Sequence, residues 1–147
     1  MKKSFILFLL AAFAVMSVGT AAFAANAKFH IGIVTGTVSQ SEDDLRGAEL
    51  LIKKYGDVAK GGMIKHLTYP DNFMSEMETT IAQIAGLADD PKMKVVVVNQ
   101  AIPGTTEGFR RIKEKRPAIL CFAGDAHEDP NVISPVADMS AHTDLVS

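Results

Sequence analysis

The sequence predicts an α/β fold: a doubly wound, mostly parallel, Rossmann-like sheet of about five strands flanked by helices. Two observations predict it. Short apolar runs alternate with helical patterns along the chain, which is typical of strand–helix–strand units with right-handed crossovers and helices on both faces. One run, 95–98, consists of four consecutive valines. It has no polar face, so we expect a parallel strand that is covered on both sides.

The first strand is expected over residues 29–35, which are rich in β-branched side chains and end at a glycine. Ser41 has the character of a helix N-cap, and the acidic residues 42–44 would lie in the first turn, where the helix dipole favours negative charge. Apolar residues then recur at helical spacing until Gly56, where the first helix should end.

A second strand is expected over residues 63–69. Lys65 and His66 interrupt its apolar pattern, which favours a position at the edge of the sheet. The second helix should cover residues 75–88, and the third strand follows at 95–99.

A third helix is expected from about Thr105 to Lys115, followed by a fourth strand over 118–123. Cys121 lies between two apolar residues of that strand, so we interpret it as a packing residue. A short fifth strand should include Val136 and Ala137.

The amino terminus has the features of a cleaved signal peptide. Lys2 and Lys3 precede an uncharged apolar stretch over 5–18, and Ala22-Phe23-Ala24 offers the small-x-small pattern of a cleavage site. The apolar stretch is shorter than the ~20 residues of a membrane span. We therefore expect residues 1–24 to be removed, residues 25–147 to form one lobe, and the product to be periplasmic or secreted.

Charge and cysteine content narrow the classes of partner. Without Lys2 and Lys3, 13 basic residues stand against 17 acidic ones, a net charge of about −4, which argues against nucleic acid and against anionic membranes. The single cysteine cannot form an internal disulfide. Because it does not begin the mature chain, we expect no lipid anchor and no other stable membrane anchor.

Ligands of doubly wound sheets bind beyond the carboxyl ends of the strands, so the residues after each strand are the site candidates. After the first strand, Thr35, Thr37 and Ser39 form a hydroxyl-rich loop before a helix N-terminus, which favours an anionic or strongly polar group. The loop lacks the spacing of a dinucleotide fingerprint and of a P-loop. The alternative is that Ser41 caps the helix and the other hydroxyls are solvated.

Aromatic and amide side chains follow the second strand. Tyr69 and Phe73 are candidates for stacking on a planar or cyclic ligand, and Asn72 for a hydrogen bond to it. Phe73 is equally well explained as a core residue. For Asp71 we favour the role of a helix cap.

Two carboxamides, Asn99 and Gln100, follow the third strand and offer donors and acceptors without net charge. They are candidates for binding a neutral polar ligand, although a helix cap would look the same. After the fourth strand, Gly124 and His127 are candidate cleft residues in an otherwise solvated acidic loop. The spacing of that loop matches no standard zinc motif, so we expect no metal.

No catalytic arrangement is apparent: there is no nucleophile elbow and no Cys/His pairing. His30 lies at the start of its strand, opposite the expected ligand edge, and His66 lies within the edge strand, so both are interpreted as structural or surface groups. We therefore expect a protein that is not an enzyme and that has no cofactor.

Three stretches resemble the amino-terminal lobe of type I periplasmic solute-binding proteins, and more closely an uncharacterised bacterial family with that fold: FHIGIVTGTVSQSEDDLRGAE, TYPDNFMSEMETTIAQIAGLADDPKMKVVVVNQAIPGTTEGFRRIKEKRPAILCFAGD and HEDPNVIS. The resemblance implies capture of a small molecule between two lobes and delivery to an ABC transporter permease or a membrane sensor. It also implies a second lobe of similar size, which the 147 residues do not include.

Two alternatives remain at this point. A sensor or receptor domain would share the same fold, and a flavodoxin-like flavin-binding protein is the other, because residues 35–39 loosely resemble a flavin-phosphate loop. The mixed hydroxyl, carboxamide and aromatic candidates suit a sugar, a nucleoside or an amino acid equally well.

Overall fold

The computed structural model describes residues 27–141, which form a five-stranded sheet in the order β2-β1-β3-β4-β5. Every neighbouring pair of strands is parallel. The strands are β1 (His30–Thr35), β2 (Ile64–Thr68), β3 (Met93–Val98), β4 (Leu120–Ala123) and β5 (Met139–Ser140). The expected fold class is confirmed, and so is the edge position of the second strand.

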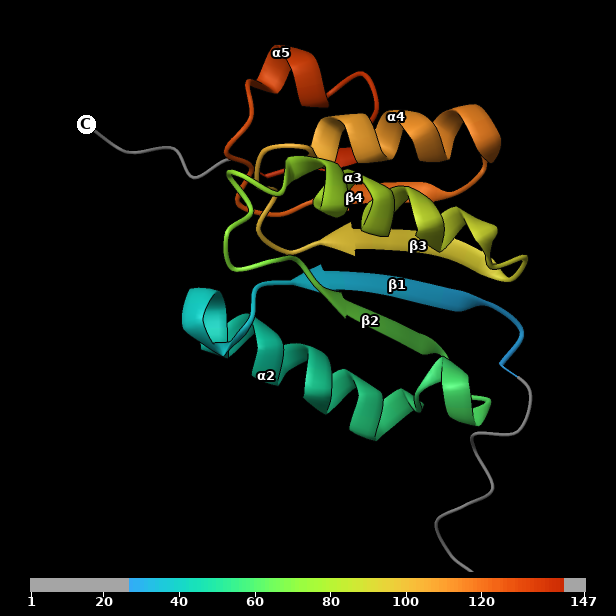
Figure 1. Ribbon diagram of the computed structural model, residues 1–147. Helices are drawn as coiled ribbons and strands as arrows, with labels where there is room; N and C mark the ends of the chain where they lie inside the picture. The colour runs from blue at the N-terminus through green and yellow to red at the C-terminus, as the bar shows by residue number, and fades with distance from the viewer. Residues whose placement is uncertain (1–26, 142–147) are drawn as a thin grey trace, which may run out of the picture.

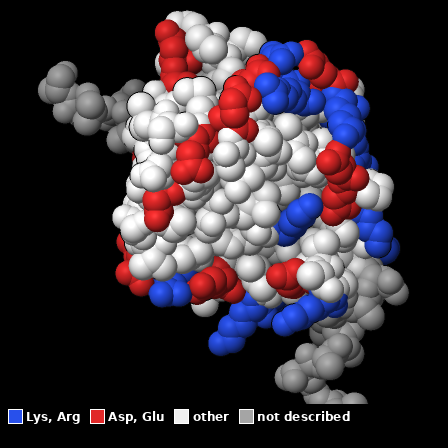
Figure 2. Space-filling view, in the orientation of Figure 1, with Lys and Arg blue, Asp and Glu red and all other residues white. Residues whose placement is uncertain are grey.

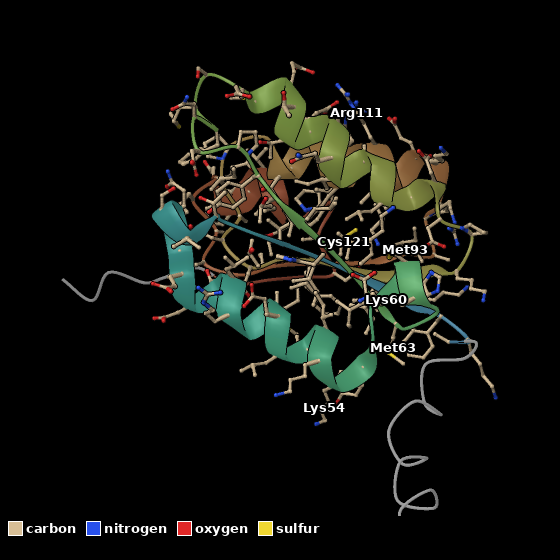
Figure 3. The ribbon with its side chains drawn as sticks, turned by 60° about the horizontal axis from the view of Figure 1, so that its bottom comes forward. Lys54, Lys60, Met63, Met93, Arg111 and Cys121 are labelled. Carbon is tan, nitrogen blue, oxygen red and sulfur yellow. The ribbon has the colours of Figure 1, made fainter. Side chains whose placement is uncertain are left out.

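Helices connect the strands and lie on both faces of the sheet (Figure 1). The α-helices are α2 (Val38–Tyr55), α3 (Met77–Gly86), α4 (Thr105–Lys115) and α5 (Pro130–Ile133), and two short 3₁₀ turns are η1 (Val58–Lys60) and η2 (Leu87–Asp89). Figure 3 shows α2, which carries Lys54, on one side of the sheet, and α3 and α4, which carries Arg111, on the other.

The two faces of the sheet are packed very differently. On the α3–α4–α5 face, fully buried side chains of β3 and β4 meet those of the helices in one large core, among them Val96, Val98, Cys121, Leu87, Phe109 and Ile112. On the α2 face, the buried cluster is limited to Ile33, Ala48 and Ile64. Most of the apolar surface that is buried on folding therefore lies on one face.

The four valines are not covered equally, contrary to the expectation. Val96 and Val98 are fully buried, whereas Val95 and Val97, which face the other way, are only half-buried. Leu120, expected inside a buried strand, is 45% exposed. The physical reason is that α2 covers only the β1 and β2 half of its face.

Two element boundaries also differ from expectation. The first helix begins at Val38 with Thr37 as N-cap, and it is interrupted at Ser41, whose φ of −157° and ψ of 86° are non-helical. Ser41 thus has the extended backbone of a cap, but inside a kinked helix. Its hydroxyl donates to Asp44 Oδ2 at 2.7 Å, so the main part of α2 starts as expected after this residue.

The last strand lies later than expected. Val136 and Ala137 donate their backbone N–H groups to Ile133 in the turn after α5, and β5 is formed by Met139 and Ser140. The α5 helix was not expected at all. Asp129 caps it by accepting the backbone N–H of Asn131 at 2.8 Å.

The expected signal peptide lies outside the described residues, as does His142. Among residues 27–141, no helix combines the length and the apolar character needed to cross a lipid bilayer.

Candidate functional site

A cleft of about 290 Å³ opens at the carboxyl ends of the strands. It lies among the segments that follow β1, β2, β3 and β4. Its lining combines apolar and polar side chains: Gln40, Phe73, Met74, Gln100, Ile102, Pro103 and His127. Of the ten candidate residues, the structure brings Phe73, Gln100 and His127 together here.

A buried tyrosine fixes the position of Gln100. The Tyr69 hydroxyl donates to Gln100 Oε1 at 2.7 Å, and the Gln100 amide nitrogen lies 3.4 Å from His127 Nε2 at the cleft. Burial, with a smaller contribution from the charge of Asp44, raises the pKa of Tyr69 to about 12, so its hydroxyl stays a donor. Gln100 therefore presents its amide nitrogen, rather than its oxygen, to the cleft.

Tyr69 does not stack on a ligand, because it is only 1% exposed. Its ring instead packs edge-on against Phe73, with centroids 5.7 Å apart. Phe73 is half-buried, packs on the core and also lines the cleft. Phe73 is therefore both a core residue and a residue of the cleft, the two roles considered from the sequence.

The hydroxyl-rich loop after β1 holds a carboxylate of the protein itself. Thr37 and Ser39 both donate to Asp71 Oδ1, the latter at 2.8 Å, and Gln40 Nε2 donates to the Asp71 backbone carbonyl at 3.1 Å. The hydrogen bonds from Thr37 and Ser39 keep the pKa of Asp71 below its usual value. The expected role of Asp71 as a helix cap is wrong, because α3 begins only at Met77 with Glu76 as N-cap.

A second carboxylate occupies the amino-terminal end of α4. Glu128 accepts the backbone N–H groups of Gly104 at 3.0 Å and Thr106 at 2.7 Å, and the Thr106 hydroxyl at 2.6 Å. The free N–H groups of this helix end are thus used by the protein. Asp71, from the segment after β2, is bound in the same way by the hydroxyls of Thr37 and Ser39 at the start of α2. The starts of α2 and α4 therefore each hold an anion of the protein itself.

Asn99 points away from Gln100, although the two are neighbours in the sequence. Its amide donates to Asp44 Oδ1 on α2 at 2.5 Å, and it lines a different, almost wholly apolar cavity on the α2 face. Side chains of consecutive residues at a strand end point to opposite faces. Asn99 therefore supports α2, and Gln100 faces the cleft.

The other candidates take supporting places. Thr35 is 1% exposed and lies 2.8 Å from His66 Nε2 between β1 and β2. Gly124 approaches the backbone of Asn99 so closely that an added Cβ would meet its carbonyl oxygen at 2.4 Å. Asn72 is exposed and accepts backbone N–H groups at the start of the α3 region.

Four lining residues were not singled out from the sequence: Gln40, Met74, Ile102 and Pro103. Gln40, Ile102 and Pro103 stand in the loops that were considered, and Met74 directly follows the segment 69–73, so position after a strand was the available signal. Gln40 is drawn into the site by its bond to the Asp71 carbonyl, and no local pattern predicts that contact across 31 residues.

Charge is divided between the two ends of the sheet. The loops that follow the first four strands, 36–41, 69–76, 99–104 and 124–129, contain no lysine or arginine. Their charged residues are Asp71, Glu76, Asp125, Glu128 and Asp129. Figure 2 shows a row of red side chains on the left, where β1 and β3 end, whereas at the top, at the right and along the lower border blue and red side chains are mixed.

The remaining candidates for chemistry are engaged in the fold. Cys121 is buried, and burial raises the pKa of its thiol to about 12, in agreement with a packing role. Within residues 27–141, no group of three or more His, Cys, Asp or Glu side chains is arranged to hold a metal ion.

Comparison with known proteins places the chain in a family. The family described as "Protein of unknown function (DUF3798)" matches residues 29–147. The chain belongs to this family. It is 40% identical over 118 residues to a protein of Treponema pallidum (strain Nichols) named "Uncharacterized protein", with 79% of this chain and 53% of the relative covered. A second such Treponema pallidum protein is 41% identical over 60 residues, 41% of this chain and 28% of that relative.

A solved structure shares the fold. It comes from Clostridium difficile 630 and is described as a "Putative transcriptional regulator". The TM-score is 0.67 at 30% identity, and the match covers 77% of this chain and 33% of that one. The chain thus spans about half the length of the first Treponema pallidum relative and about a third of the solved protein.

Proposed function

We propose that this protein of the DUF3798 family is an exported solute-binding protein that captures a small polar ligand at the carboxyl edge of its sheet and delivers it to an ABC transporter. The observation that carries the proposal is the cleft, where an oriented amide, an imidazole and apolar side chains converge. Small-molecule sites combine a mostly apolar lining with a few placed polar groups in this way.

The charges around the cleft restrict the class of ligand. Asp71 and Glu128 accept hydrogen bonds from neutral hydroxyl and backbone N–H groups. These partners do not neutralise the negative charge of the two carboxylates. No lysine or arginine stands in the four loops. We therefore propose a ligand that is neutral or cationic overall, such as a sugar, a nucleoside, a zwitterionic amino acid or an amine, and not a net anion such as a phosphate or a dicarboxylate.

The same carboxylate weighs against flavin binding. A flavin phosphate at the loop before α2 would have to displace Asp71 from Thr37 and Ser39, and would approach a carboxylate whose pKa is lowered. Like charges at hydrogen-bond distance repel strongly outside bulk water.

The alternative is a ligand-binding domain of a sensor. One observation favours it: the solved structure with this fold, at 30% identity, is described as a "Putative transcriptional regulator". In that case the same cleft would bind the same class of ligand, and ligand binding would be coupled to signalling instead of transport. Neighbouring genes for a permease and ATPase would favour transport, and a histidine kinase gene would favour sensing.

The test compares two adjacent amides. Gln100→Ala should weaken ligand binding by roughly 1–3 kcal/mol, because a bound polar group loses its partner. It should also lower the free energy of unfolding, because the buried Tyr69 hydroxyl loses its acceptor, so affinity is the quantity that distinguishes the two variants. Asn99→Ala is the matched control: it removes the bond to Asp44 and should lower stability while leaving affinity nearly unchanged. The measurements are small-molecule mass spectrometry of the purified protein, followed by calorimetry with the solute identified. Equal loss of affinity in both variants would contradict the site.

A further inference from the structure

Within residues 27–141, the α2 face of the sheet is open over three of its five strands. Of the α-helices described in this range, only α2 lies on that face, and it packs on β1 and β2 (Figure 1). The apolar side chains of the uncovered strands form what we call the open strip: Val95, Val97, Leu120, Phe122 and Met139. Leu120 is 45% exposed and Met139 62% exposed, and the other three are half-buried.

The strip is continuous across the strands. Val95 is in register with Leu120, Val97 with Phe122, and Phe122 with Met139, so these side chains share one face of the sheet in adjoining rows. Between the strip and α2 lies a cavity of about 320 Å³. Its lining is apolar except for Asn99 and the Tyr55 hydroxyl, and includes Leu51 and Val97.

The flank of α2 also faces open space. Gly47, Leu51 and Tyr55 follow each other at intervals of four residues and so share one side of the helix. Leu51 is 39% and Tyr55 42% exposed. A Cβ added to Gly47 would meet nothing within 4 Å, so another element can approach this part of α2 closely.

The dimensions of the strip fit one helix. Three strands at a spacing of about 4.8 Å span about 14 Å, and a helix with its side chains is about 10 Å wide. β3 and β4, of six and four residues, extend about 20 and about 13 Å, and the two-residue β5 about 7 Å. The footprint is therefore about 200 Å², well below the about 800 Å² per partner that a stable protein–protein complex buries.

We propose that the open strip is the docking site of an amphipathic helix from the same polypeptide, supplied by the part of the longer relatives that this chain does not match. All-parallel sheets bury both faces, and an apolar strip of this kind in water favours association or aggregation. The first Treponema pallidum relative has about as much sequence again beyond the match. A second copy of this chain is the other occupant, and the small footprint disfavours it.

The test introduces one negative charge into the open strip of two proteins of different length. Glutamate is introduced at Leu120 in this chain and at the aligned position of the full-length Treponema pallidum relative. Val132→Glu is the matched control, since Val132 is an apolar residue of α5 on the opposite face and is 54% exposed. In this chain, Leu120→Glu should move the melting temperature by no more than about 2 °C and reduce the fluorescence of bound anilinonaphthalene sulfonate.

In the full-length relative, glutamate at the Leu120 position should lower the melting temperature by more than about 4 °C, and the Val132 control should not. Met139→Glu serves as a second variant if the first prevents folding, because Met139 lies at the rim of the strip. Equal shifts in the long and short proteins would overturn the proposal. So would sedimentation of this chain as a dimer that Leu120→Glu converts to a monomer, since a second copy would then cover the strip.

Discussion

At the scale of single residues, the site depends on one buried hydroxyl. Tyr69 reaches from the end of β2 to Gln100 after β3, and its bond to Oε1 leaves the Gln100 amide nitrogen facing the cleft. Gly36 permits this arrangement, because a Cβ at that position would come within 2.9 Å of the Tyr69 hydroxyl. Tyr69, which the ligand does not contact, thus sets the orientation of the Gln100 amide. As a result, Gln100 offers a hydrogen-bond donor to the ligand and not an acceptor.

Tyr69→Phe should lower the free energy of unfolding by about 0.5–1.5 kcal/mol, because it removes one hydrogen bond and keeps the ring. It should also weaken ligand binding, since Gln100 is no longer held. Urea unfolding measures the first effect. Tyr55→Phe is the control, because Tyr55 is partly exposed on α2, and its ring contact with Lys54 survives the change. Identical stability losses in the two variants would show that the Tyr69 hydroxyl contributes nothing.

His66 should give the fold a measurable pH dependence. Burial lowers its pKa below the usual 6.5, so the folded state favours the neutral imidazole that contacts Thr35. The contribution is complete above about pH 6.5 and is lost as the pH falls toward the lower pKa of the folded state. Urea unfolding from about pH 7.5 to about pH 5.5 should show a smaller loss of stability in His66→Gln than in the wild type. An unchanged slope would contradict this assignment.

At the scale of elements, strongly patterned segments were predicted well. The helix Thr105–Lys115 was found with the expected bounds, because Gly104 and the strand-forming run after Pro117 delimit it. The short elements were missed for physical reasons. A two-residue strand such as Met139–Ser140 has no periodicity of its own, and it exists because its backbone pairs with β4.

The site was predicted at the level of loops and not of side chains. The fold dictates that the segments after the strands meet at one edge, which is why Phe73, Gln100 and His127 are found there. Asn99 and Gln100 were indistinguishable in the sequence. Which one faces the cleft depends on the register of β3, where Val96, Val98 and Gln100 share one face and Val97 and Asn99 the other.

The two faces of β3 should respond differently to charge. Val96→Asp should abolish cooperative folding, because its carboxylate would be buried in the main core without a partner. Val97→Asp should give a destabilised but folded protein, since Val97 is half-buried beside an open cavity. Circular dichroism during thermal unfolding distinguishes the two. The assignment of the two faces would be contradicted if Val96→Asp still unfolded cooperatively. It would also be contradicted if only Val97→Asp lost its cooperative transition.

At the scale of the whole molecule, two uneven distributions stand out. The loops that border the cleft contain carboxylates but no lysine or arginine, and apolar packing is concentrated on the α3–α4–α5 face. The first restricts the ligand to neutral or cationic solutes in the proposed function. The second is the basis of the proposal that a further helix docks on the open strip. If a second lobe completes the site, this chain alone should bind its ligand weakly.

Weak binding of a ligand at the carboxyl edge of the sheet is best followed by the backbone amide chemical shifts of isotope-labelled protein covering residues 25–147. Neutral sugars, nucleosides, amino acids and amines are added at millimolar concentration, with sugar phosphates and dicarboxylates as matched anions. We expect at least one neutral or cationic class of ligand to shift the backbone amides of Gln40, Met74, Gln100 and His127, and the anions to leave them unchanged. Shifts confined to the opposite edge, or produced by the anions alone, would contradict it.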